Sequence, residues 1–368
     1  MRILHTEWSG GFGGQEIRIL NEMQEMRRRG CYLALATKED ARILLKAKEQ
    51  GFTTFTLPFR RKTDLESIYQ LHKIAKNFDI INTHSGVDTW LGGLASIGSG
   101  AKFIRTRHLS NKIHPSRLNF INSLADFIIT TGESIREAMI RENRIKRERI
   151  LSIPTGIDTE TFCKEKYDKE AMKTKYNLPQ NKLIIGNLGV LRAMKRQDVF
   201  IEVAREICQK YPDVFFVIAG SGDGQIRLEN LAKEVNQAVN QEVVRLLGHI
   251  ENPAEFLATL DIFMLTSDKN EGVPQSLMQA LAMEIPSIAS DIGSIADLHF
   301  YSQGKPNFIL TKNPSLEEFA EALESLIRER EREREIILPS RDFIVKNFSL
   351  AAMGEKTMQV YQNLLVNS

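Results

Sequence analysis

The sequence is poor in the features that mark disulfide-stabilised, membrane-spanning or disordered chains. Its three cysteines, Cys31, Cys163 and Cys208, are too few and too scattered among 368 residues for a disulfide framework or a cysteine-rich metal site. No apolar run approaches the length of a membrane span, and a glycine-rich turn stands where a signal peptide needs its apolar stretch. Charged residues make up 26% of the chain but nearly cancel at a net charge of +2, which disfavours disorder. We therefore expect a folded, cytoplasmic chain.

The charge is uneven along the chain. Residues 1–160 contain 25 Lys and Arg against 18 Asp and Glu, a net charge of +7, whereas the remainder contains 24 against 29, a net charge of −5. Basic clusters lie at 27–29, 60–62 and 144–149. They fit ordinary surface charge, or an anionic partner such as the inner face of the cytoplasmic membrane, to which the protein would bind peripherally. The sign-alternating run after Leu326 predicts an exposed helix, and no nucleic acid partner is expected.

Short apolar or β-branched runs alternate with longer helical patterns throughout. The length favours two domains. The alternation predicts an α/β fold with doubly wound parallel sheets, because strand–helix–strand crossovers in one sheet are right-handed. A charged segment over 164–181 separates two such series. The expected helices cover 15–29, 39–50, 64–77, 88–97, 117–124 and 133–142 in the first series, and 195–210, 223–236, 253–259, 274–283 and 315–335 in the second.

Ligands of doubly wound sheets bind beyond the carboxyl ends of the strands, so two such domains would face each other across a binding cleft. The first loop of this kind spans residues 9–16, where Gly13 and Gly14 would let backbone N–H groups approach an anion at a helix N-terminus. A flexible turn is the alternative, and a dinucleotide fingerprint is not matched. In the second series, Gly189 precedes Arg192 and Lys195, which could neutralise a leaving diphosphate or merely solvate a loop.

Residues 261–290 form the most informative segment. A buried strand ends at Ser267, and Gly272 and Pro274 lead into an apolar helix, with Pro274 suited to its first position. Glu271 thus stands at a helix entrance facing the expected cleft, where a carboxylate can hold sugar hydroxyls. Gln279 lies one turn inside the helix.

These motifs resemble those of the retaining glycosyltransferases of family 4, which have the GT-B fold, over nearly the whole chain. GGFGGQE resembles their Gly-Gly loop and SIPTGIDTETF the end of their first domain. VIAGSGDG and RLLGHIENPAEFLATLDIFMLTS resemble their nucleotide-side strands, and NEGVPQSLMQALAMEIPSIAS their segment with two acids seven residues apart. Two departures concern the donor side: Gln279 replaces the second acid, and Val190 replaces a usual arginine, which leaves Arg192 and Lys195 as the substitute pair.

The resemblance implies two Rossmann-like domains over 1–163 and 164–349, and a helix within 350–368 that crosses back to the N-terminal domain. The C-terminal domain would bind the nucleotide. The implied reaction moves a sugar, with retention at the anomeric centre, from a nucleoside-diphosphate sugar to a hydroxyl of a glycan or lipid-linked acceptor. The expected donor is a UDP-sugar, the expected context is bacterial lipopolysaccharide or other surface polysaccharide synthesis, and neither cofactor nor metal is expected.

The resemblance also assigns roles to residues. The catalytic candidates are Glu271, His108, Arg192 and Lys195. The donor-binding candidates are Gly13, Gly14, Gly189, Gly220, Gly222, His249, Ile250, Gly272, Val273, Pro274 and Gln279. Glu16 and His84 are placed on the acceptor side, although a loop hydrogen bond fits His84 equally well. The remaining histidines, His5, His72, His114, His249 and His299, have no patterned partner, so we predict no metal site.

Two other functional classes stay open. A GT-B epimerase or hydrolase of nucleotide sugars would share the donor pocket, but no additional acid–base pair supports it. A non-catalytic anion-binding protein would explain the basic N-terminal half, but it would not need the four catalytic candidates.

Overall fold

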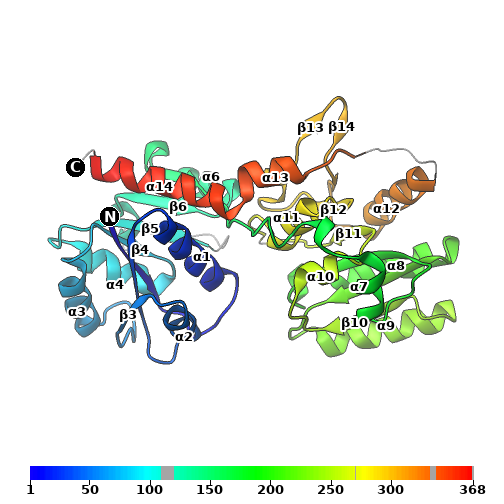
Figure 1. Ribbon diagram of the computed structural model, residues 1–368, viewed down its shortest axis with the longest axis horizontal. Coiled ribbons are helices and arrows are strands. Elements are labelled where there is room, and N and C mark those ends of the chain that lie inside the picture. The colour runs from blue at the N-terminus through cyan, green and yellow to red at the C-terminus, as the bar shows by residue number, and fades with distance from the viewer. Residues whose placement is uncertain (109–119, 270, 332–336, 367–368) are drawn as a thin grey trace. The chain divides into compact units, whose positions relative to one another are not determined.

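The computed structural model describes residues 1–108, 120–269, 271–331 and 337–366, and it divides the chain into two compact units (Figure 1). Unit 1 comprises Met1–Gly156 and Leu350–Ser368, and unit 2 comprises Ile157–Ser349. The expected domain boundary at residue 163 places 157–163 in the first domain. The structure includes them in unit 2, because Ile157 bridges to Ser349 and Phe162 is buried in a core of that unit.

Unit 1 contains a seven-stranded parallel sheet with strand order β3-β2-β1-β4-β5-β6-β7. Its strands are β1 (Arg2–Glu7), β2 (Tyr32–Thr37), β3 (Thr53–Thr56), β4 (Ile80–Thr83), β5 (Lys102–Arg107), β6 (Phe127–Thr130) and β7 (Ile150–Ser152). Its helices are α1 (Gly14–Arg28), α2 (Arg42–Glu49), α3 (Leu65–Ala75), α4 (Gly86–Ser96), α5 (Ile121–Leu124), α6 (Glu133–Asn143) and α14 (Leu350–Val366). The helix expected over 117–124 lies partly outside the described residues.

Unit 2 contains a six-stranded parallel sheet with strand order β10-β9-β8-β11-β12-β15. Its strands are β8 (Leu183–Leu188), β9 (Val214–Ala219), β10 (Val244–Gly248), β11 (Ile262–Leu265), β12 (Ser287–Ser290) and β15 (Ile309–Thr311), with a separate hairpin of β13 (Tyr301–Ser302) and β14 (Lys305–Pro306). Its helices are α7 (Lys169–Lys175), α8 (Gln197–Lys210), α9 (Gln225–Val239), α10 (Pro253–Leu257), α11 (Gln275–Ala282), α12 (Leu316–Glu331) and α13 (Arg341–Phe348).

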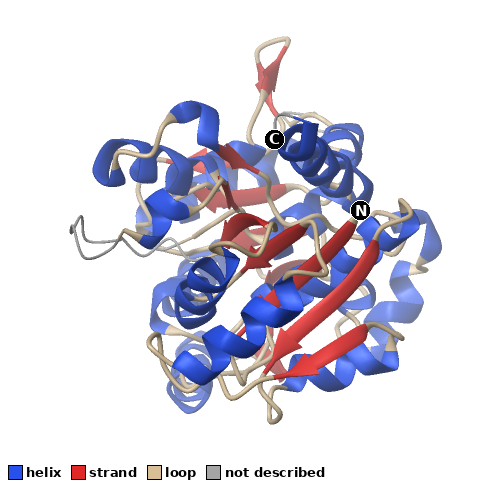
Figure 2. Ribbon diagram, turned by 90° about the vertical axis from the view of Figure 1, so that its left-hand side faces the viewer, coloured by secondary structure: helices blue, strands red, loops and turns tan. Residues whose placement is uncertain are grey.

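Both sheets are buried on both faces, which is why their strands read as continuous apolar runs. Consecutive residues of β1, Ile3 and Leu4, pack into two different core clusters, as alternation along a strand requires. Ile184 and Ile185 of β8 do the same in unit 2. Figure 2 shows the red strands enclosed by blue helices. The predicted class, α/β with two doubly wound parallel sheets, is confirmed.

The last helix, α14, belongs to unit 1 and lies beside α1 (Figure 1). Tyr361 of α14 is fully buried, and its hydroxyl donates to Glu22 Oε1 of α1 at 2.5 Å. Glu22 also pairs with the buried Arg18, whose Nη1 donates to the carbonyl of Ile153 at 2.8 Å. Among the described residues, no helix is long and apolar enough to cross a membrane.

The strand orders fix where a ligand would bind in each unit. In a doubly wound sheet, the crevice opens at the carboxyl ends of the two strands where the order reverses. These strands are β1 and β4 in unit 1 and β8 and β11 in unit 2. The loops that follow these four strands, together with those after their neighbours, carry most of the candidate residues.

Candidate functional site

In unit 2 the structure joins two of the predicted catalytic residues at the reversal of strand order. Lys195 lies in a 3-10 turn, Ala193–Lys195, after β8, and Glu271 follows β11. Lys195 Nζ donates to Glu271 Oε1 at 2.5 Å, with the lysine side chain 20% and the glutamate side chain 7% exposed. A nearly buried carboxylate and its counter-ion thus stand where the fold places its ligand.

Serines and a glycine fix the Glu271 loop. Ser267 Oγ donates to the same Glu271 Oε1 at 2.5 Å, and Ser290 Oγ at the end of β12 donates to the carbonyl of Ser267 at 2.5 Å. Gly293 packs against the backbone of Glu271 so closely that a Cβ there would lie 2.0 Å from the Glu271 carbonyl oxygen, and its φ is +64°. Sequence reasoning missed Ser290 and Gly293, because nothing local links them to Glu271.

The Lys195 turn is tied to the end of β11 by two further contacts. Thr266 Oγ1 donates to the carbonyl of Lys195 at 3.0 Å, and the N–H of Asp268 donates to the carbonyl of Met194 at 3.0 Å. The backbone of the turn that carries Lys195 is therefore fixed by hydrogen bonds from two residues that follow β11. Arg192 differs, since it is exposed and only begins the same turn. The structure thus places Lys195, but not Arg192, against Glu271.

The predicted glycines of unit 2 allow two turns to pack together. Gly220 has a φ of +141°, and a Cβ on it would lie 1.9 Å from the carbonyl oxygen of Gly189. A Cβ on Gly222 would lie 2.5 Å from the carbonyl oxygen of Leu191. The N–H groups of Gly189 and Gly220 already donate to Ala219 and Gly248. These two amides are engaged within the protein, so the glycines position the turn rather than offer those N–H groups to an anion.

The other donor-side candidates surround the same edge of the sheet. His249 is exposed and Ile250 half-buried after β10. Pro274 is the N-cap residue of α11 rather than its first helical residue, with Gly272 and the buried Val273 before it. Gln279 lies half-buried inside the helix. Asn270, in the same loop, lies outside the described residues.

In unit 1, three histidines from neighbouring strands form a hydrogen-bonded chain. His5 Nδ1 lies 2.9 Å from His84 Nε2, and His84 Nδ1 lies 3.0 Å from His108 Nε2. His5 is within β1, His84 follows β4 and His108 follows β5. No sequence pattern linked His5 to a partner, but parallel pairing brings β1 beside β4 and so supplies one. His84 is 4% exposed with both ring nitrogens engaged, so this geometry favours the loop hydrogen bond over an acceptor contact.

Two carboxylates flank this chain, Glu7 at the end of β1 and Asp88 in the first turn of α4. Glu7 accepts from the N–H of Ser9 at 2.6 Å and from Gln15 at 2.5 Å, so it joins both ends of the glycine loop. Burial, with the charge of Asp88 as a second cause, raises the pKa of Glu7 to about 8. Asp88 accepts from Thr6 and from the N–H of His84. The position of Glu7 in the sequence did not signal this raised pKa.

The glycine loop itself ends in a capped helix. Gly13 is the N-cap residue of α1 and Gly14 its first residue. Glu16 is 5% exposed, and its Oε2 accepts from the N–H of Gly13 at 2.7 Å. The carboxylate thus has a structural partner in the first turn of the helix. Its acceptor role stays a prediction.

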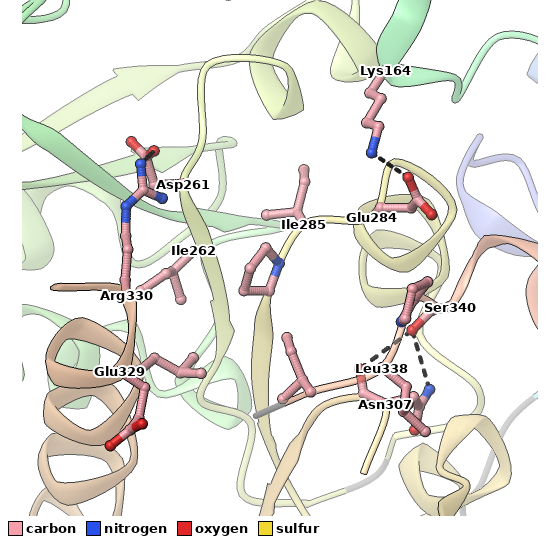
Figure 3. A pocket seen from close by; sticks show the side chains of 14 residues that line it. Lys164, Asp261, Ile262, Glu284, Ile285, Asn307, Glu329, Arg330, Leu338 and Ser340 are labelled. Atoms are coloured by element: carbon pink, nitrogen blue, oxygen red, sulfur yellow. Dashed lines mark hydrogen bonds and ion pairs between the residues drawn. The ribbon is translucent and has the colours of Figure 1, made fainter. Parts of the chain in front are cut away.

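Other polar features lie away from these edges. A cavity of about 450 Å³ in unit 2 opens at the amino ends of β11 and β12, opposite the Glu271 edge (Figure 3). Its polar groups are largely paired with each other: Lys164 with Glu284, Arg330 with Asp261, and Ser340 with Asn307. The rings of His72 and His299 hydrogen-bond to the backbone carbonyls of Ala95 and Phe308, and His114 lies outside the described residues. Within the described ranges, no group of three His, Cys, Asp or Glu residues could hold a metal ion.

Comparison with known proteins assigns a family to each half of the chain. The family model described as "Glycosyl transferases group 1" matches residues 168–341, and that described as "Glycosyltransferase Family 4" matches residues 12–161.

The relatives are similar over most of their length. One is the UDP-Gal:alpha-D-GlcNAc-diphosphoundecaprenol alpha-1,3-galactosyltransferase of Escherichia coli, 26% identical over 83% of this chain and 81% of that protein. The O-antigen biosynthesis glycosyltransferase WbnH of Escherichia coli is 23% identical over 90% of this chain and 92% of its own length. Among solved structures, Anabaena HepE in complex with UDP has a TM-score of 0.84 at 18% identity, covering 99% of this chain and 100% of that chain. The fold is therefore that of the GT-B enzymes.

Proposed function

Since the chain belongs to glycosyltransferase family 4, we propose that it transfers a hexose from a UDP-sugar to a hydroxyl of a lipid-linked or glycan acceptor, with retention at the anomeric centre. The observation that carries this proposal is the Lys195–Glu271 pair at the reversal of strand order in unit 2. The UDP bound to HepE and the lipid-linked substrate named for the galactosyltransferase support the donor and acceptor classes. WbnH supports a place in surface polysaccharide synthesis.

The mechanism assigns the donor to unit 2. Glu271 accepts hydrogen bonds from hydroxyls of the transferred sugar, and its own bonds to Lys195 and Ser267 fix its direction. Lys195 and Arg192 neutralise the charge that develops on the diphosphate as the glycosidic bond breaks, which lowers the barrier because these groups are preorganised. Gly189 and Gly220 let the nucleotide-side turns pack closely. Because the cations carry this charge, the reaction needs no metal.

Unit 1 supplies the acceptor side and His108. We assign His108 to a hydrogen bond with the transferred sugar near the reacting centre. Burial lowers the pKa of His108 well below its ordinary value, so it acts as a neutral imidazole. Gly13 and Gly14 begin α1, whose N-terminus favours negative charge, and the glycine loop therefore suits a phosphate of the donor or acceptor.

A donor screen tests this proposal directly. A ligand at a hundred times its dissociation constant stabilises the folded protein that binds it by about 2.7 kcal/mol. Among UDP-, GDP- and ADP-sugars, we expect the UDP-sugars to give this stabilisation. Thermal unfolding measures the effect, with the free sugar as control. Product analysis by NMR then gives the anomeric configuration, which should match the donor, and activity should persist with a chelator present. Stabilisation by no nucleotide sugar would contradict the assignment.

Lys195→Ala should have a larger effect than Arg192→Ala. Lys195 is paired with Glu271, whereas Arg192 is exposed. If Lys195 stabilises the leaving diphosphate, its loss should lower kcat more than it raises the KM for the donor. Steady-state kinetics of both variants separate the two effects. A change confined to KM would show that the lysine acts on the ground state.

We also propose that unit 1 binds anionic membranes through the start of α3. Arg61 and Lys62 are exposed there beside Leu65 and Tyr69, which are 77% and 60% exposed. By contrast, Arg28 and Arg29 of the first basic cluster both pair with Glu25.

Each cation near an anionic leaflet contributes about 1 kcal/mol, and salt screens this attraction. Arg61→Glu should therefore reduce co-sedimentation with anionic liposomes at low salt, whereas Lys233→Glu, an exposed charge reversal in unit 2, should not. Absence of binding by the unmodified protein at low salt would contradict membrane attachment and leave the transferase assignment unaffected.

A further inference from the structure

In the histidine chain of unit 1, the number of ring protons requires both hydrogen bonds to point the same way along the chain. His5 is fully buried and His84 is 4% exposed, and their rings stack with centroids 5.2 Å apart. Burial is the main cause that lowers the pKa of His5, His84 and His108. Each ring is therefore a neutral imidazole at neutral pH, with one nitrogen that donates and one that accepts.

The middle histidine couples the two hydrogen bonds. His84 uses Nε2 toward His5 and Nδ1 toward His108, and it has a single proton for both. It must therefore donate in one bond and accept in the other. As a result, the two bonds point the same way along the chain, and the tautomer of His5 sets that of His108.

The surroundings of His5 select one of the two directions. His5 Nε2 and Arg18 Nε are buried without a hydrogen-bond partner among the described residues, whereas Arg18 Nη2 forms an ion pair with Glu22 Oε2 at 3.6 Å. Both Arg18 and Glu22 act electrostatically on His5. Arg18 Nε is an N–H donor without an acceptor, so an N–H at His5 Nε2 would add a second unmatched donor, whereas a bare Nε2 is an acceptor. His5 therefore keeps its proton on Nδ1.

We propose that His5 and His84 are positioning residues that hold His108 as the Nδ1–H tautomer, so that His108 meets the transferred sugar as a hydrogen-bond donor. His5 Nδ1–H donates to His84 Nε2, and His84 Nδ1–H donates to His108 Nε2, which leaves the proton of His108 on Nδ1. This tautomer recognises an oxygen acceptor, such as a sugar hydroxyl oxygen. The functional part of the inference rests on the proposed contact of His108 with the donor.

Nitrogen NMR of the full chain labelled with [15N]histidine tests the tautomer without any substrate. Long-range 1H–15N spectra distinguish a protonated ring nitrogen from a bare one, and His108→Gln assigns the signals by their loss. We expect protonated Nδ1 and bare Nε2 in His5, His84 and His108. Protonated Nε2 in His108 would overturn the proposal, whatever the activity of the enzyme.

Variants of His5 test the positioning role. His5→Phe removes the donor to His84 and should leave His84 and His108 exchanging between tautomers, with kcat lowered by up to about tenfold, the worth of one hydrogen bond. His5→Asn offers an amide N–H near the place of Nδ1 and should restore both the tautomer and most of kcat. His72→Phe is the matched control, because the ring of His72 hydrogen-bonds to the carbonyl of Ala95 rather than to another histidine.

The outcomes separate this inference from the proposed function. If His108→Ala leaves kcat unchanged, the catalytic assignment of His108 fails, and with it the functional part of the inference. An unaltered His108 tautomer in His5→Phe would overturn the coupling through His84 even if kcat fell. If His5→Phe does not fold, the spectra of the unmodified protein still decide the direction of the chain.

Discussion

Glu271→Ala is expected to lower kcat by about a hundredfold or more while the fold stays intact. Loss of a preorganised polar contact at a reacting centre has this order of effect. Glu271 also holds Lys195 at 2.5 Å, so the variant removes the proposed sugar contact and releases the cation that we assign to the diphosphate. Circular dichroism and thermal unfolding verify the fold, and initial rates at saturating donor give kcat.

Two variants sharpen this test. Glu271→Gln keeps a hydrogen-bonding group but loses the charge that pairs with Lys195, so its kcat should lie between those of Glu271→Ala and the unmodified enzyme. Glu255→Ala breaks a comparable ion pair of unit 2, that of Lys175 with Glu255, away from the site, and its kcat should not change. An unchanged kcat in Glu271→Ala would remove Glu271 from the reacting centre.

The fold could be predicted from the sequence because buried parallel sheets leave a strong local pattern. The expected helices over 274–283 and 15–29 correspond to α11 and α1, Gln275–Ala282 and Gly14–Arg28. Short elements with little amphipathic signal were missed. Examples are β15, which has three residues, and α13, which lies between α12 and α14. The expected extension of the helix of 315–335 beyond Glu331 lies outside the described residues.

The site could be predicted in part, because residues within a local motif are recognisable, whereas a partnership set by strand order is not. Glu271 and Lys195 are recognisable because each follows a strand within its own motif, although 76 residues separate them. The partnership of His5 with His84 depends on β1 lying beside β4, a pairing that skips two strands. The strand order of a doubly wound sheet could have signalled it, since His84 follows the strand that lies beside that of His5. Glu7 gave no such signal, because its raised pKa comes from burial.

Gly293→Ala is expected to have the second large effect, although Gly293 carries no functional group. Its φ of +64° would cost an alanine about 1–2 kcal/mol of stability. In addition, the new Cβ would lie 2.0 Å from the carbonyl oxygen of Glu271, a backbone atom that must then move. Ser294, whose N–H donates to the same oxygen at 3.3 Å, would move with it. Misplacement of a catalytic group by about 1 Å can cost a hundredfold in rate, so kcat should fall by about that factor.

Gly304→Ala is a control that introduces left-handed backbone strain without displacing Glu271. Gly304 has a φ of +76° in the β13–β14 hairpin, but a Cβ there meets no atom within 4 Å. Both variants should therefore lose a similar amount of stability from the left-handed backbone, as measured by thermal unfolding, and only Gly293→Ala should lose activity.

The double variant Gly293→Ala with Glu271→Ala adds a further criterion. If Gly293 acts by placing Glu271, its substitution should change kcat little once Glu271 is absent, because effects of residues that act as a unit are not additive. Full additivity of the two losses would mean that Gly293 supports the site by a route other than the Glu271 carboxylate.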